Sequence, residues 1–295
     1  MLDFINDVAQ YEFLQRALIT AIVVGVVCGI VGTFIVLRGL ALMGDAIAHA
    51  VLPGVAVSYL LGVSTFFGAL VFGIIASLSI GAISQNSRIK SDSSIGIVLS
   101  AFLALGVILI AQAQTAVDLS QILFGNVLAV AESDMMLTVV ITVSVVALLL
   151  LFYKELLVST FDPTMAQTYG LNVRTIHYAL MVVLTVVTVT ALQAVGVILV
   201  VALLITPAAT AHLLTNRLSV MILLASTIGA LSAISGLYFS FEYNASSGAV
   251  IVLSAAAAFL IAFFFAPQRG LIAQRITRRR TVAAQSEQRL TTDER

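Results

Sequence analysis

Long apolar runs with almost no charge make up most of this chain, and they decide what it can fold into. A helix needs about 20 apolar residues to cross the hydrocarbon core of a bilayer. The sequence therefore predicts an all-α polytopic membrane protein with about nine transmembrane helices. The predicted spans lie near residues 14–37, 46–62, 66–84, 93–113, 135–153, 174–194, 196–214, 218–240 and 247–266. Eight spans are the alternative, because the second run is short and only Gly196 divides the sixth from the seventh.

Composition excludes the other broad classes. Of the 295 residues, 61% are hydrophobic and 9% are charged, whereas a soluble domain averages about 45–50% apolar and about 25% charged residues. So little charge cannot cover a water-exposed surface, and so little polarity excludes a disordered chain. The 14 basic and 14 acidic residues cancel, which excludes a strongly basic nucleic-acid binder. The single cysteine, Cys28, excludes a disulfide framework.

The distribution of charge predicts the orientation. Basic residues favour the cytoplasmic side of a membrane protein. With nine spans and the N-terminus outside, the inner segments hold Arg38, Arg88, Lys90, Lys154, Arg174, Arg217 and the seven arginines from Arg269 onward, which leaves Arg16 alone on the outer side. The outer segments carry Asp3, Asp7, Glu12, Asp118, Glu132, Asp134 and Glu242. We therefore expect one transmembrane domain over 1–268 and a basic cytoplasmic tail over 269–295, close to anionic lipids.

One ionisable pair lies inside an apolar zone. Asp45 and His49, in GDAIAHAVLPG, are four residues apart, which places both side chains on one face of a helix. A carboxylate and an imidazole can share a divalent cation such as Mn²⁺. Two ligands are too few for tight binding, but two copies related by a two-fold axis would supply four. The alternative is a pair that only hydrogen-bonds and caps a broken helix.

Three other places in the sequence combine polar or helix-breaking residues, or a short apolar run, with the predicted spans. Pro53 and Gly54 predict an interruption of the second span, either beside a transport pathway or as an ordinary kink. His177 and His212 lie at inner span ends and are interpreted as packed or interfacial side chains. The apolar run 119–130 is too short to cross and is expected to form a re-entrant or interfacial helix on the outer face.

The inner loop after the fifth span predicts a short capped helix. In STFDPTMAQTYGL, Asp162 suits an N-cap, Pro163 suits the first helical position, and Gly170 suits the C-terminal stop. The expected helix has about seven residues. Such a helix either docks a cytoplasmic partner or simply connects two spans.

Several motifs are missing from the sequence. It contains no GxxxxGK[ST] nucleotide-binding loop, no HExxH and no GxSxG, which argues against ATP binding by this chain and against a membrane protease. An arginine ladder and a TVGYG filter are also missing, which weakens the channel class.

Four segments, in order along the chain, resemble the membrane permease subunits of the metal-ion ABC importer family. These segments are RGLALMGDAIAHAVLPGVAVSYLLG, LFGNVLAV, FDPTMAQTYGL and VGVILVVALLITPAATAHLL. The resemblance implies import of manganese, zinc or iron. The sequence of the first segment is more similar to the manganese and iron members than to the zinc members. It implies a fold similar to that of the vitamin B12 and siderophore importer permeases without their first helix. The implied location is a bacterial plasma membrane.

The resemblance also implies roles for residues and partners. Asp45 and His49 match the metal-coordinating pair of the family, and Asp162, Pro163, Ala166 and Gly170 fall in the helix that couples to the ATPase. The implied partners are a second copy of the chain, separate cytoplasmic ATPase subunits and an extracytoplasmic metal-binding protein. The chain itself is then no enzyme and holds no resident cofactor. The rival functions are a permease for a chelated metal or vitamin, and an ATP-independent channel.

Overall fold

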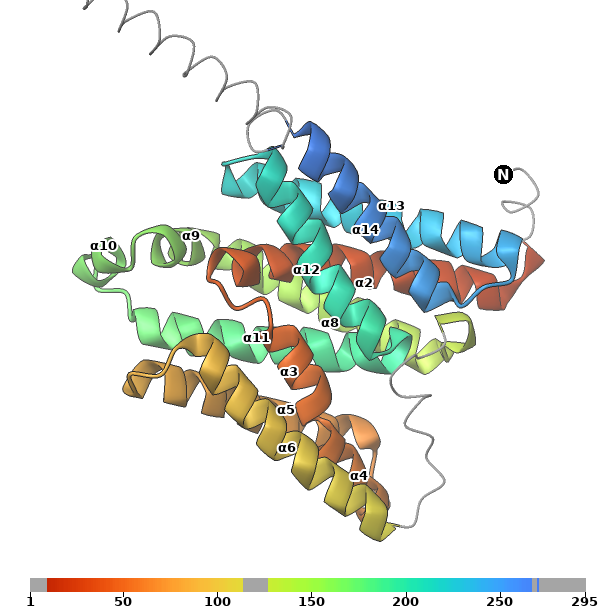
Figure 1. Cartoon of the computed structure of the whole chain (residues 1–295), viewed down its shortest axis with the longest axis horizontal. Helices are drawn as coiled ribbons and strands as arrows, with labels where there is room; N and C mark the ends of the chain where they lie inside the picture. The colour runs from red at the N-terminus through yellow and green to blue at the C-terminus, as the bar shows by residue number, and fades with distance from the viewer. Residues whose placement is uncertain (1–9, 114–126, 267–269, 271–295) are drawn as a thin grey trace, which may run out of the picture.

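Helices form every regular element in the part of the chain that the computed structural model describes, which is residues 10–113, 127–266 and 270 (Figure 1). The elements are α2 (Glu12–Leu37), α3 (Met43–Ala50), α4 (Leu52–Leu61), α5 (Thr65–Asn86), α6 (Ser91–Ala113), η1 (Val127–Ala129), α8 (Glu132–Leu151), α9 (Tyr153–Phe161), α10 (Pro163–Thr168), α11 (Val173–Val195), α12 (Val197–Leu214), α13 (Leu218–Tyr243) and α14 (Ser247–Phe265). The all-α prediction is confirmed for these residues.

Nine candidate spans are present among the described residues, which agrees with the sequence-based count. The second span consists of α3 and α4 together, running from Met43 to Leu61. Gly196 separates α11 from α12 with φ 86° and ψ 163°, a conformation that interrupts the helix and favours glycine. The sixth and seventh runs are therefore two helices, and the eight-span alternative is not supported.

Two sequence predictions fall wholly or mostly outside the described residues. Of the run 119–130, only residues 127–130 are described, and Val127–Ala129 form the short helix η1 packed on α2 and α14. The basic tail 269–295 is described only at Gly270. The predictions of a re-entrant or interfacial helix and of a cytoplasmic tail stay predictions.

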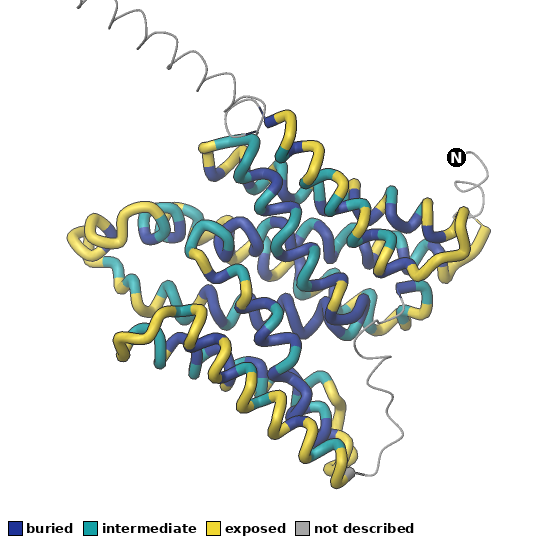
Figure 2. The backbone as a smooth tube through the Cα atoms, in the orientation of Figure 1, coloured by how far each residue is buried: buried dark blue, intermediate teal, exposed yellow. Residues whose placement is uncertain are grey.

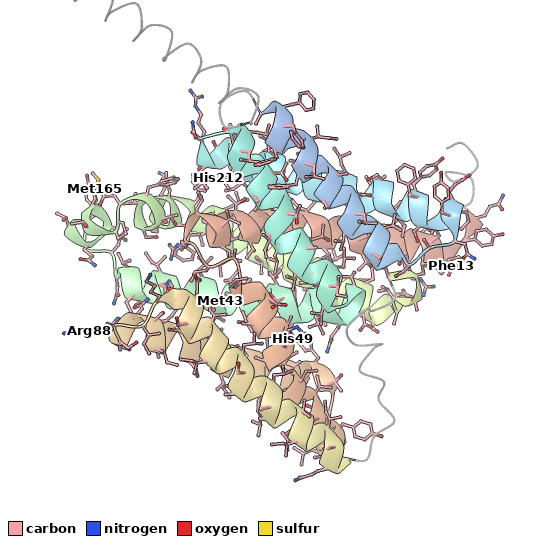
Figure 3. All side chains as sticks on the ribbon, viewed as in Figure 1. Phe13, Met43, His49, Arg88, Met165 and His212 are labelled. Atoms are coloured by element: carbon pink, nitrogen blue, oxygen red, sulfur yellow. The ribbon has the colours of Figure 1, made fainter. Side chains whose placement is uncertain are left out.

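The two ends of the bundle carry different segments. In Figure 3, Arg88 and Met165 lie at one end, whereas Phe13, next to the start of α2, lies at the opposite end. The α9–α10 turn and the α5–α6 connection share the first end (Figure 1). The connection that carries Arg88 therefore lies at the same end of the bundle as the α9–α10 turn, opposite the start of α2.

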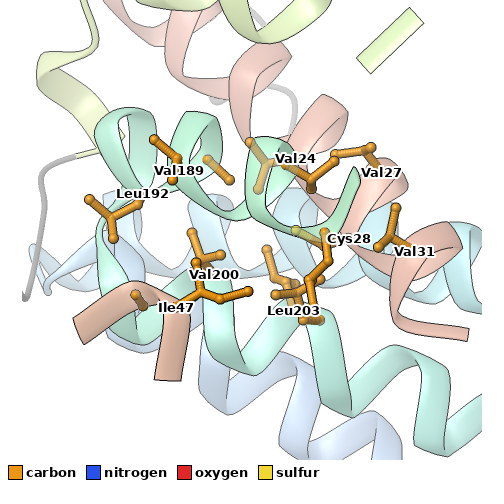
Figure 4. Packing of buried hydrophobic residues seen from close by; sticks show 14 of the residues in the cluster. Val24, Val27, Cys28, Val31, Ile47, Val189, Leu192, Val200 and Leu203 are labelled. Carbon is orange, nitrogen blue, oxygen red and sulfur yellow. The ribbon is translucent and has the colours of Figure 1, made fainter. Parts of the chain in front are cut away.

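The core lies where α2 and α11 meet α3 and α12. Figure 4 shows Cys28 from α2, Ile47 from α3, Val189 from α11 and Leu203 from α12 packed together. All four side chains are at most 1% exposed. The buried segments in Figure 2 run through this centre, while the peripheral helices expose most of their outer faces. Helix α3, although only eight residues long, is thus inserted into the middle of the bundle.

Glycine allows α2 to pack backbone to backbone on α13. A Cβ atom added to Gly25 would lie 2.7 Å from the carbonyl oxygen of Gly229, and one added to Gly29 would lie 2.6 Å from that of Ala225. In a bilayer, where lipid is as apolar as leucine, such close approach is a main source of helix–helix attraction. The four-residue glycine spacing of the first span is therefore part of the central interface.

We expect Gly25→Ala to destabilise the protein by about 1–3 kcal/mol, because the added methyl group must push α2 and α13 apart. The measurement is the midpoint of thermal unfolding of the detergent-purified protein. Gly96→Ala is the matched control, since Gly96 lies in exposed α6 and a Cβ there meets nothing within 4 Å. Equal midpoints for both variants would contradict this account of the interface.

Candidate functional site

Helix α3 presents one polar face and buries the rest of its surface. Six of its eight residues are buried, and the two exceptions are Asp45 and His49. Their side chains are 41% and 26% exposed. Because the two residues are one helical turn apart, both project from the same side of α3. The structure thus places a carboxylate and an imidazole together, half-open, in an otherwise apolar part of the molecule.

The separation of the two side chains suits a shared cation. His49 Nε2 lies 3.5 Å from Asp45 Oδ1. A cation about 2.1 Å from both atoms would subtend an angle of roughly 110°, which is a normal ligand–metal–ligand angle. No group of three or more histidine, cysteine or acidic side chains that could hold a metal occurs in the described residues. The described part of one chain therefore offers two protein ligands at this point.

Small residues explain why α3 fits into the bundle. It packs against α5, α6, α11 and α12. A Cβ at Gly44 would lie 2.9 Å from the Cδ1 atom of Leu204 on α12, so a larger residue beside Asp45 would have to displace the end of that side chain. Ala46, Ala48 and Ala50 are buried with almost no exposed surface. This packing fixes the direction in which Asp45 and His49 project.

The second span is interrupted one turn beyond His49. α3 ends at Ala50, Val51 separates it from α4, and Pro53 occupies the first turn of α4. Proline has no N–H to donate to the carbonyl of His49, four residues earlier. Gly54 has a different task, because a Cβ there would collide with the backbone carbonyl of Gly68 on α5. The interruption thus lies beside the Asp45–His49 pair, while Gly54 serves helix packing.

The other two histidines are not gathered at this pair. His212 lies in the last turn of α12, well separated from His49 in Figure 3. His177, in α11, is half-buried, packs edge-on against Tyr178, and has a buried Nε2 atom without a hydrogen-bond partner. No metal-ligand group of three or more includes either residue in the described part of the chain.

Helix α10 has the caps that its sequence predicts. Asp162 accepts a hydrogen bond from the Met165 N–H at 2.8 Å, and Pro163 begins the helix. At the other end Gly170 has φ +80°, and the Leu171 N–H donates to the Ala166 carbonyl at 3.0 Å. This is a Schellman stop. α10 has six residues rather than about seven.

The surface of this segment is almost entirely open. Ala166 is buried, and every other residue from 161 to 170 is exposed. Phe161, Met165 and Tyr169 are 56%, 47% and 69% exposed, which leaves apolar surface at the end of the bundle that also carries Arg88. A rigid short helix with exposed apolar side chains is suited to contact another protein.

The sequence analysis missed one helix and one contact. Residues 153–161 form a separate helix, α9, immediately before α10. Arg38, interpreted only as an inner-side charge, donates hydrogen bonds to Ser159 Oγ at 2.9 Å and to Thr160 Oγ1 at 3.2 Å. Burial lowers the pKa of the Arg38 guanidinium, but the group stays charged at neutral pH. The only sign of this contact in the sequence is the pair of adjacent hydroxyl residues Ser159 and Thr160, and the sequence does not show that Arg38 is their partner.

Comparisons with known proteins agree with this fold. The chain matches the ABC 3 transport family over residues 10–266. It is 62% identical over 269 residues to the manganese transport system membrane protein MntC of Listeria monocytogenes, covering 91% of this chain and 96% of that protein. The chain therefore belongs to the ABC 3 transport family.

Two solved structures share the architecture. PsaBC from Streptococcus pneumoniae, in complex with a Fab, is 53% identical with a TM-score of 0.82, covering 91% of this chain and 97% of that one. A metal-chelate type ABC transporter in an inward-facing conformation is 17% identical with a TM-score of 0.69 and covers 87% of each chain. The second likeness bears on the fold alone, and it agrees with the fold class that the sequence predicts.

We expect Asp162→Ala to loosen α10 by about 1 kcal/mol, because the Met165 N–H loses its acceptor. Hydrogen exchange of the α10 amides should then accelerate roughly five-fold, which is the same free energy expressed as a ratio. Asp162→Asn keeps an acceptor oxygen and is the matched control. Unchanged exchange in Asp162→Ala would show that the side chain does not hold this helix.

Proposed function

We propose that this chain is the permease subunit of an ATP-binding cassette importer that moves divalent manganese into the cytoplasm. The observation that carries the proposal is the half-open Asp45–His49 pair on a helix whose other residues are all buried. Ionisable groups within membrane spans are costly and usually mark an ion pathway. Relatives named as manganese transport proteins, 62% identical to this chain, support the choice of metal.

The donor atoms suit this substrate. Carboxylate oxygen and imidazole nitrogen both bind Mn²⁺, and they also accept Fe²⁺ and Zn²⁺. Two copies of the chain facing each other across a two-fold axis would bring two Asp45 and two His49 side chains to one cation. Such a site binds well enough to admit the ion and weakly enough to release it. The second span is interrupted at the same level, after His49, and substrate sites of transporters are typically formed at interrupted helices.

The energy for transport comes from a separate partner in this proposal. α10 is exposed, capped at both ends and carries apolar side chains, which fits a contact with a cytoplasmic ATPase subunit. Asp162, Pro163, Ala166 and Gly170 give this helix its shape rather than its contact surface. Arg88 lies at the same end as α10, with the start of α2 at the opposite end, which supports a cytoplasmic location for α10 and an outer N-terminus. An extracytoplasmic binding protein would deliver the metal to the opposite face.

We expect Asp45→Asn and His49→Gln each to reduce manganese uptake by at least about ten-fold, since each removes one ligand type from the pathway. The measurement is uptake of radiolabelled Mn²⁺ into proteoliposomes that hold the assembled complex and ATP. Asp92→Asn is the control, because Asp92 is an exposed carboxylate in the first turn of α6.

The same assay separates the rival functions. Uptake at the wild-type rate in both site variants would overturn the assignment of the pair. Uptake of a chelated metal in place of the free ion would favour a chelate permease. Metal flux without ATP, and without any ATPase that co-purifies, would favour a channel. Repeating the assay with Zn²⁺ and Fe²⁺ determines the metal preference directly.

We expect Tyr169→Ala to weaken binding of the ATPase subunit, because it removes an exposed aromatic side chain beside α10. Tyrosine is enriched among the interface residues whose truncation costs more than about 1 kcal/mol, and we expect a loss of affinity of at least about five-fold. The measurement is co-purification of the two subunits from detergent. Tyr243→Ala is the matched control, since Tyr243 is 74% exposed but lies at the end of α13. Equal recovery of the ATPase with both variants would argue against this docking surface.

A further inference from the structure

Arg38 lies between the two parts of the molecule that the proposed function requires to communicate. It follows the last residue of α2 and precedes the turn into α3, the helix that carries Asp45 and His49. Its guanidinium reaches Ser159 and Thr160, more than 120 residues further along the chain, in α9, which leads directly into α10. The side chain therefore joins the helix that holds the metal pair to the segment that holds the proposed ATPase contact.

The link between Arg38 and α9 is specific. The Nη2 atom donates to Ser159 Oγ at 2.9 Å and to Thr160 Oγ1 at 3.2 Å, and Nε donates to Thr160 Oγ1 at 3.2 Å. Ser159 is 4% exposed, and its hydroxyl in turn donates to the Leu156 carbonyl at 3.2 Å. An arginine at a membrane surface usually extends toward water or lipid phosphate. Arg38 instead turns inward to two hydroxyl groups of its own chain.

The connection between α9 and α10 is short, and it forms hydrogen bonds with both helices. Asp162 is the single residue between the two helices. Its N–H donates to the Val158 carbonyl at 2.9 Å, in the last turn of α9, and its carboxylate accepts from the Met165 N–H of α10. Ser159 and Thr160 lie in that same last turn. A displacement of α10 therefore moves the two hydroxyls that hold Arg38.

The turn that leads from Arg38 to Asp45 and His49 is also fixed by hydrogen bonds. Gly39 has φ +68° and donates its N–H to the Val36 carbonyl at 3.2 Å, and the Leu40 N–H donates to the Ile35 carbonyl at 3.0 Å. This is a second Schellman stop. The Met43 N–H then bonds the Leu40 carbonyl at 2.9 Å, and Asp45 follows two residues later. A hydrogen-bonded turn, rather than a slack loop, connects Arg38 to α3.

We propose that Arg38 is the positioning residue that couples the ATPase-facing helix α10 to the Asp45–His49 helix α3, through its hydrogen bonds to Ser159 and Thr160. The inference rests on the proposed function, and Arg38 itself touches no substrate. The planar guanidinium bonds both hydroxyls at once, which a lysine ammonium cannot reproduce in the same geometry. Movement of α10 during the ATPase cycle is thereby transmitted to the orientation of the metal pair.

The test compares Arg38→Lys with the double variant Ser159→Ala/Thr160→Val in the complete complex with its ATPase. Lysine keeps the positive charge and so preserves membrane orientation. We expect each variant to retain assembly, equilibrium Mn²⁺ binding and ATP hydrolysis within about two-fold, while Mn²⁺ transported per ATP hydrolysed falls at least about ten-fold. Combining all three substitutions should add little further loss, because both changes break the same link.

Arg174→Lys is the matched control. Arg174 is an exposed arginine of α11 that donates to Asn86 Oδ1 at 3.3 Å, so it also bonds another helix but has no place in this link. An unchanged transport-to-ATP ratio in Arg38→Lys, or an equal fall in Arg174→Lys, would overturn the inference. If the wild-type complex moved no metal at all, the proposed function would fail instead, and the two results are distinguishable.

Discussion

The high cost of charge and unpaired polarity in a bilayer is the constraint on which the rest of this structure depends. Among the described spans, many hydroxyl groups donate to the backbone of their own helix, as Thr33 does to the Gly29 carbonyl at 2.9 Å and Thr185 to the Met181 carbonyl at 2.9 Å. The connection that carries Arg88 lies at the same end of the bundle as α10. Against this background, an Asp45–His49 pair left half-open in the second span stands out as the candidate site.

Close packing at small residues fixes how the helices of the bundle lie against one another. Gly25 and Gly29 bring α2 against α13, and Gly44 brings α3 against α12. Helix α3 is too short to be stable alone, so its orientation depends on the helices around it. The direction in which the Asp45 and His49 side chains project is thus a property of the whole bundle. In the proposed coupling, the same dependence lets a movement of α10 reach the Asp45–His49 pair through Arg38.

Most of the fold and half of the candidate site could be predicted from particular residues. Apolar run lengths place the nine spans, Gly196 divides α11 from α12, and Asp162 with Gly170 marks the ends of α10. These features are local, since each depends on residues within a few positions. α9 was missed because its sequence continues the apolar fifth span. The bond from Arg38 to Ser159 was missed because it joins positions 121 residues apart, and no local pattern records that contact.

The sequence by itself determined the all-helical class, a count of eight or nine spans, the charge asymmetry and the turn spacing of Asp45 and His49. These follow from hydrophobicity and helical periodicity, which act over short stretches of chain. Only the tertiary structure decided that α3 is buried on every side except the one bearing this pair. The tertiary structure alone also brought Arg38, which follows α2, to Ser159 and Thr160 of α9. Both outcomes arise from packing between distant helices, where the fit of side chains and backbones selects one arrangement among many that the same local helices would allow.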